Sequence, residues 1–272
     1  MSSTPAAAQR IPKIIALPVE FVGRRVLFYY REFAAFGGYM KEVFHWTFRR
    51  PFRVQLLFAQ MEFIGNQSLN ILMISGLAVG AVFGLQIGAV FRVFGAESLT
   101  GGATGRALCQ ELAPMVTAIL LTGRAGSAMT AEIATMKVNE QVDAMEAMAT
   151  DPISYLVVPR FLASLAIIPL LCAIFIFVGV LGSYIVGQLL FNVDEGMFLD
   201  KISKIVTSRD IWRGLVKSFV FSGLMAAICC RYGLKASGGA KGVGIATTNS
   251  VVVTLLSILF VDVVMTYFQI VW

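Results

Sequence analysis

The sequence predicts an all-α polytopic membrane protein, and three observations support this fold class. Hydrophobic residues make up 57% of the 272 residues and charged residues only 14%, whereas a soluble domain usually carries about 25% charged residues. Several uncharged apolar runs reach the roughly 20 residues that a bilayer span needs. Basic residues are concentrated in residues 1–53, as expected for a segment held on the cytoplasmic side of a first span.

Residues 1–53 are predicted to form an N-terminal tail and an interfacial amphipathic helix. Residues 1–12 are small and polar and are expected to be disordered. Apolar and aromatic residues recur at helical spacing within residues 14–48: Val22, Val26, Tyr29 and Phe33. Because the basic residues fall mostly elsewhere, this pattern is typical of a helix lying in the headgroup layer. The alternative is a helix packed on the protein's own core.

Residues 54–272 are predicted to form a five-span domain. The predicted spans are residues 63–91, 106–133, 161–193, 211–231 and 245–269. With the N-terminus in the cytoplasm, residues 134–160 and 232–245 face the cytoplasm and the C-terminus is periplasmic. The basic loop at 232–245 agrees with this orientation.

Two groups of small residues predict close helix packing. The first span carries one glycine every four residues: Gly76, Gly80, Gly84 and Gly88. Such a row lies along one helix face and lets another backbone approach closely. That backbone belongs either to a neighbouring helix of this chain or to a second copy. In the second span, Gly123, Arg124 and Gly126 lie in a similar small-residue stretch.

Residues 138–149 are predicted to form a short amphipathic helix in water, directly after the second span. Asp143 and Glu146 lie on its polar face, and Asp151-Pro152 follows as a stop, because the residue before a proline disfavours helix. A charged helix in this position suggests that a soluble partner pushes on it. A solvated connector is the alternative.

The charged residues within the predicted spans include Glu111, Lys217 and Asp262. Counted along their helices, all three fall in the outer half of the membrane. Intramembrane charges are costly unless paired or wetted. We therefore expect Lys217 to pair with Glu111 or Asp262, or all three to polarise one cavity. An otherwise apolar lining fits a lipid or another hydrophobic cargo better than a sugar or an ion.

The sequence carries no signal for chemistry of its own. No nucleotide-binding G-x-x-x-x-G-K-[ST] spacing and no nucleophile–base pair occur. The cysteines have no zinc-ligand spacing, and no metal cluster or nucleic-acid pattern is visible. A function driven by ATP therefore needs a separate ATPase.

One long stretch carries a family resemblance. ELAPMVTAILLTGRAGSAMTAEIATMKVNEQVDAMEAMATDP at 111–152, with PRF at 159–161 and ATT at 246–248, resembles the MlaE (YrbE) permease family of MCE-type ABC lipid transporters. The resemblance covers about residues 50–272. Family members often carry arginines after the last basic loop, and this chain departs from them with Ile245 and Asn249.

The resemblance implies a subunit of a larger assembly. It implies a homodimeric, exporter-like ABC permease in the inner membrane of a Gram-negative bacterium, bound to two copies of a cytoplasmic ABC ATPase that holds ATP with Mg. A periplasmic MCE-domain hexamer and a STAS-domain protein are the further implied partners. The implied cargo is phospholipid, moved between inner and outer membranes through an apolar outward-facing cavity at the dimer interface. The chain itself is expected to be no enzyme and to hold no cofactor.

Carried over position by position, residues 140–148 match the family's coupling helix, which docks on the ATPase. The residues expected to couple are Glu140, Asp143, Met145, Glu146 and Met148. Glu111, Lys217 and Asp262 look like polar positions of the family's transmembrane core. Two other functions stay open. One is a proton-coupled secondary transporter with Glu111 and Asp262 as proton carriers, and the other is a scaffold that anchors an MCE-domain assembly.

Overall fold

A computed structural model describes residues 13–49 and 53–271. The tail predicted at residues 1–12 lies outside the described residues, as do the side chains of Val22, Val26, Tyr29 and Phe33. The chain divides after Phe48, so the first helix and the remainder are described separately. That helix, α1, is continuous over Lys13–Thr47 and exposes large side chains such as Tyr30 and Phe44.

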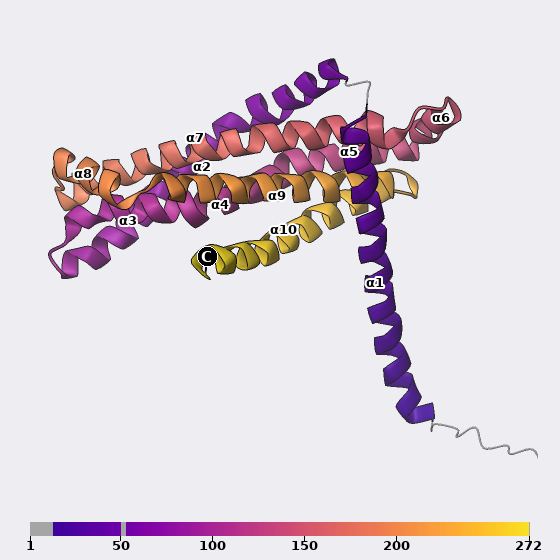
Figure 1. Ribbon diagram of the computed structural model, residues 1–272, viewed down its shortest axis with the longest axis horizontal. Helices are drawn as coiled ribbons and strands as arrows, with labels where there is room; N and C mark the ends of the chain where they lie inside the picture. The colour runs from indigo at the N-terminus through magenta and orange to yellow at the C-terminus, as the bar shows by residue number, and fades with distance from the viewer. Residues whose placement is uncertain (1–12, 50–52, 272) are drawn as a thin grey trace, which may run out of the picture. The chain divides into compact units, whose positions relative to one another are not determined.

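The rest of the described chain, from residue 53 on, is helical without any strand, which confirms the predicted fold class (Figure 1). Five helical segments are long and apolar enough to cross a membrane: Val54–Val93, Glu97–Val138, Ile153–Phe191, Ser208–Leu234 and Gly239–Val271. Each begins before the predicted apolar stretch, because a helix continues into flanking polar residues where hydropathy falls. Four also end after it, whereas the third ends at Phe191, two residues before the predicted end at 193.

The individual helices follow in chain order. They are α2 (Val54–Val93), α3 (Thr100–Ala107), α4 (Ala113–Leu121), α5 (Ser127–Val138), α6 (Gln141–Ala147), α7 (Val158–Phe191), α8 (Glu195–Ile205), α9 (Ser208–Leu234) and α10 (Gly239–Val271). Short π-helical turns, η2 (Leu108–Leu112) and η3 (Thr122–Gly126), join α3 to α4 and α4 to α5. A third, η4 (Ile153–Val157), precedes α7.

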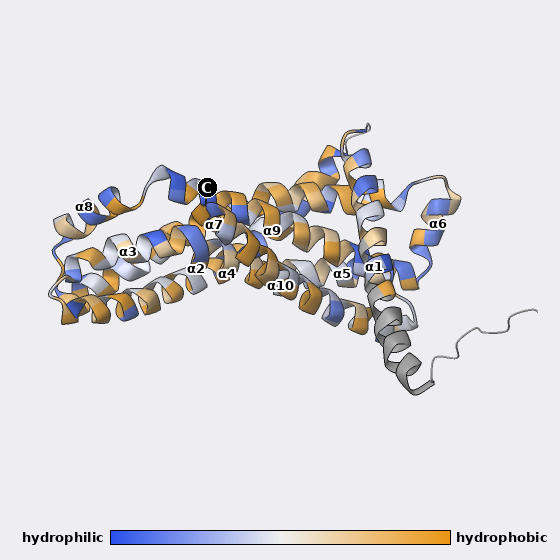
Figure 2. Cartoon of the chain, turned by 60° about the horizontal axis from the view of Figure 1, so that its bottom comes forward, coloured by the Kyte–Doolittle hydropathy of each residue, from blue (hydrophilic) through white to orange (hydrophobic). Residues whose placement is uncertain are grey.

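Helix α6 lies at one end of this bundle and α8 at the opposite end (Figure 1). The hydropathy colouring places hydrophilic residues on both of these short helices, while the long helices between them are mainly hydrophobic (Figure 2). The charged helix expected between the second and third spans is therefore outside the apolar body. We call these the α6 end and the α8 end.

Three loop and helix boundaries differ from the sequence prediction. Most of the loop expected at 92–106 is helical, since α3 begins at Thr100. The polar stretch 194–213 contains α8, whose first turn is capped by the Asp194 side chain accepting from the Met197 N–H at 3.2 Å. The helix expected at 138–149 is shorter, because Glu140 adopts a left-handed backbone (φ 59°) that separates α5 from α6.

The glycine row of α2 faces α7 within the same chain. A Cβ on Gly76 would lie 3.3 Å from the Phe175 carbonyl oxygen, and one on Gly84 would lie 3.0 Å from the Ser183 Cα. Gly80 meets the backbone of Gly179 so closely that any side chain there would collide. The row therefore brings two helices of one copy into backbone contact.

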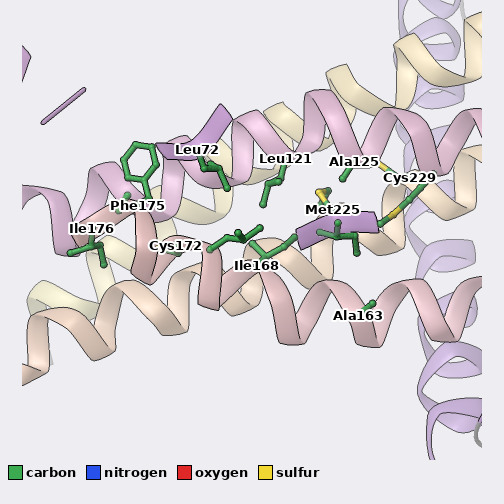
Figure 3. Packing of buried hydrophobic residues seen from close by; sticks show 14 of the residues in the cluster. Leu72, Leu121, Ala125, Ala163, Ile168, Cys172, Phe175, Ile176, Met225 and Cys229 are labelled. Atoms are coloured by element: carbon green, nitrogen blue, oxygen red, sulfur yellow. The ribbon is translucent and has the colours of Figure 1, made fainter. Parts of the chain in front are cut away.

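The apolar core forms where α2, α4, α7 and α9 converge (Figure 3). Its buried members include Leu72, Leu121, Ile168, Cys172, Phe175, Met225 and Cys229. A membrane helix gains little from burying apolar side chains away from lipid, so close packing and polar contacts between helices must fix their positions. This makes the polar contacts between η2, α9 and α10 informative.

Candidate functional site

Lys217 on α9 is a fully buried cation at the place where the second, fourth and fifth spans meet. Its side chain is 0% exposed, and Nζ donates to Glu111 Oε2, to Asp262 Oδ1 at 3.0 Å and to Thr266 Oγ1 at 2.7 Å. The Thr266 hydroxyl lies 3.2 Å from Glu111 Oε1, to which it can donate. We call Glu111, Lys217, Asp262 and Thr266 the charge cluster.

The local backbone of each helix places these groups. Glu111 lies in η2, whose π-helical turn precedes Pro114. Proline has no N–H to donate back along the helix, which favours an irregular turn just before it. Gly214 on α9 packs directly against the Cys109 carbonyl of η2, where a Cβ would collide. That close approach brings Lys217, one turn further along α9, to Glu111.

Asp262 and Thr266 lie one turn apart on α10, so both reach the same point on α9. The sequence singled out Asp262 through its charge, but Thr266 is a common residue in a span and gave no such signal. The structure thus brings together all three predicted charged residues and adds a hydroxyl that completes the hydrogen bonding of Lys217.

The cluster contains one ammonium group and two carboxylates. Lys217 is enclosed, whereas the side chains of Glu111 and Asp262 are 38% and 15% exposed. Buried ion pairs gain from each other only when their hydrogen bonds are well satisfied, and here Lys217 uses three oxygen partners. The cluster can therefore tie α9 and α10 to η2 and present acidic oxygens at its Glu111 side.

A cavity of about 410 Å³ lies at the α8 end. One of its lining residues, Gln110, directly precedes Glu111 of the charge cluster in the sequence. The cavity is lined by Phe91, Leu99, Ala103, Arg106, Ala107, Gln110 and Ile205. Gln110, the residue before Glu111, donates to Asp210 Oδ1 at 2.5 Å, and Asp210 also caps the first turn of α9 with Thr207. The sequence analysis did not identify Gln110 or Asp210, because each reads as an ordinary polar residue near a span end.

The predicted coupling residues occupy α6 and its two flanks. Val142 is buried and anchors the helix, while Asp143 and Glu146 are exposed. Lys137 at the end of α5 forms an ion pair with Asp143, which ties the two helices together. Met145 is half-buried, and Met148 is 71% exposed. Glu140 is not in the helix but at its left-handed start.

The small residues around Arg124 do not form one packing group. Gly126 faces α9, where a Cβ would lie 2.9 Å from Cys229 Sγ. Gly123 is exposed, and no atom of the described chain lies within 4 Å of its Cβ position, so close packing at Gly123 stays a prediction. Gly123 and Gly126 therefore point to different sides of η3. Arg124 is half-buried and bonds to α2 instead.

The described residues contain no group of three or more His, Cys, Asp or Glu side chains that could hold a metal ion. The chemistry that this arrangement offers is electrostatic: a clamp between helices in the apolar body, and acidic surface on α6.

The known proteins that this chain resembles are all described as permeases in the matches that follow. A family model described as Permease MlaE matches residues 57–268. A probable ABC transporter permease protein of Synechocystis sp. is 42% identical over 199 residues, covering 73% of this chain and 76% of the relative. The intermembrane phospholipid transport system permease protein MlaE of Haemophilus influenzae is 40% identical over 212 residues, covering 78% and 81%. A probable ABC transporter permease protein of Rickettsia felis is 35% identical over 245 residues, covering 90% and 95%.

Proposed function

The chain belongs to the MlaE permease family, and from that premise we propose that it is the membrane-spanning subunit of an ATP-driven phospholipid transporter. It is a transporter component rather than an enzyme. The observation that supports the proposal most strongly is the match to a phospholipid transport permease across most of both chains.

The two ends of the bundle have different roles in this proposal. A cytoplasmic ABC ATPase, present in two copies and holding ATP with Mg, docks on the exposed acidic side of α6. The α8 end faces the periplasm, where an MCE-domain hexamer collects the lipid, and a STAS-domain protein binds the ATPase. Two copies of the chain enclose an apolar cavity that opens on the periplasmic side of the inner membrane.

The charge cluster supports a mechanical role for the helices that it joins. A clamp between η2, α9 and α10 lets a displacement at the α6 end move the outer halves of these helices together. Rigid elements with satisfied polar contacts transmit such movements better than loosely packed ones. Binding of ATP would then narrow the cavity and expel the lipid.

Transport by the purified assembly in vesicles tests this function. With the ATPase and ATP present, fluorescent phospholipid should leave the vesicles for an acceptor, and omission of ATP should stop the transfer. A pH gradient without ATP should drive nothing. Transfer driven by the pH gradient alone would favour the proton-coupled alternative, and an assembly that forms but moves no lipid would favour the scaffold.

A further inference from the structure

Arg124 is a cation at membrane depth whose described contacts are all neutral. Its Nη1 donates to Ser68 Oγ at 2.6 Å and to the Phe63 carbonyl oxygen at 3.3 Å, and its Nη2 donates to Gln67 Oε1. The guanidinium carbon lies 5.3 Å from the centre of the Phe63 ring. These contacts position the group on α2, but they bring no negative charge to it.

Three other cations within the candidate spans have carboxylate partners. Lys217 has Glu111 and Asp262, Arg160 has Glu132 at 2.8 Å, and Arg106 lies 3.9 Å from Asp210. Among residues 53–271, Arg124 forms no ion pair. A charge within a span is costly unless an opposite charge or water reaches it. An anion from outside the chain would therefore supply the opposite charge that Arg124 lacks.

The guanidinium is accessible to such an anion. The three bonds to α2 use only part of its N–H donors, and Gln67, which accepts one of them, is exposed. Gly123, the preceding residue, is exposed with open space at its Cβ position. Two further exposed amides on α2, Asn66 and Asn70, make no hydrogen bond to any described side chain or backbone group.

Arg124 lies in the half of its span that is nearer to the α6 end, from which its side chain can reach lipid headgroups. At about 1.5 Å per residue, Gln67 lies roughly 7.5 Å along α2 from the exposed Glu62, and Arg124 lies roughly 12 Å from Glu132. The Arg124 side chain reaches back to Phe63, toward the α6 end. Long basic side chains in membranes extend in this way to the nearer interface.

We propose that Arg124, Gln67, Ser68, Asn66 and Asn70 form a binding site for the phosphodiester of a lipid in the leaflet at the α6 end. Guanidinium groups bind phosphate oxygens through paired, charge-assisted hydrogen bonds, and the amides add donors beside them. The site requires only that the chain crosses a bilayer. The proposal of this site does not depend on what drives transport. An experiment can therefore refute the lipid site without refuting the proposed function, and the reverse.

Gln67→Glu is the sharpest variant for a test. It keeps the size of the side chain and the contact to Arg124, but it supplies an internal carboxylate that competes with the phosphate. Native mass spectrometry of the purified assembly, titrated with phosphatidylglycerol, should show binding weakened by at least about tenfold. Arg124→Gln, which removes the charge, should weaken binding similarly. Arg92→Gln, at the exposed opposite end of α2, should leave it unchanged.

Further titrations identify the ligand. Diacylglycerol, which lacks the phosphate, should bind equally to all variants, and inorganic phosphate should not displace phosphatidylglycerol. Unchanged lipid binding by both Gln67→Glu and Arg124→Gln would overturn the proposal. Displacement by inorganic phosphate would show a site for soluble anions instead. Loss of the second copy from the assembly mass in Gln67→Glu would show a contact between chains.

Discussion

Replacing Lys217 by Met should lower the free energy of unfolding by about 3–5 kcal/mol, because removal of one partner leaves uncompensated buried charge. Lys217 is the only cation that contacts Glu111 and Asp262 in the described structure. Without it, two carboxylates face each other in an apolar region, and α10 loses the ion pair that joins it to α9. Unfolding of the purified protein in detergent measures the change, and lipid transport should be lost with it.

Two further variants separate the charge effect from general damage. Lys204→Met removes an exposed ion pair with Asp200 on α8, which is worth at most about 1 kcal/mol. The triple change Lys217→Met, Glu111→Gln and Asp262→Asn removes all the charge and should recover much of the lost stability, since neutral residues of similar size replace the cluster. A single Lys217→Met variant as stable as the triple variant would show that the cluster is not a clamp.

Reversing the charge of Glu146 should weaken binding of the ATPase by at least about tenfold, because a like charge placed in a complementary interface costs several kcal/mol. Glu146 is exposed on α6 and has no ion-pair partner in the described structure. Co-purification of the ATPase with the Glu146→Lys variant measures the loss. Asp143→Lys should act in the same direction, but it also breaks the ion pair with Lys137.

The matched control is Asp200→Lys, an equal charge reversal on exposed α8 at the opposite end of the bundle. It should leave ATPase binding intact. Both variants should insert into the membrane as the unaltered chain does. If ATPase binding survived Glu146→Lys and failed in Asp200→Lys, the ATPase would dock at the α8 end. That result would contradict the proposed role of α6.

The sequence predicted what depends on long apolar runs and on isolated charges. The five spans are visible because a bilayer requires such runs, and Lys217 stands out because a lysine in a span needs a partner. Three features depended on local geometry instead. The π-helical turns at Glu111 and Arg124, the close approach of Gly214 to Cys109 and the hydroxyl of Thr266 leave no distinctive residue pattern.

Small residues illustrate the same limit. The spacing of Gly76, Gly80, Gly84 and Gly88 predicted a close contact but not its partner, which the structure shows to be α7. Gly123 has the same composition around it, yet no atom of the described chain lies within 4 Å of its Cβ position. Which side of a helix a glycine faces depends on the turn before it, and a π-helical turn shifts that direction.

The central claim is that α6 faces the cytoplasm and receives the force of an ATPase there. A cysteine introduced at Met148 tests directly on which side of the membrane α6 lies, because Met148 is 71% exposed. The natural cysteines do not interfere, since all four are buried: Cys109, Cys172, Cys229 and Cys230. The chain should be expressed without the ATPase, so that α6 is uncovered. A membrane-impermeant maleimide should label Met148→Cys in inverted vesicles and not in intact cells, with the opposite result for Asp200→Cys on α8. Labelling of Met148→Cys from outside intact cells would contradict the account.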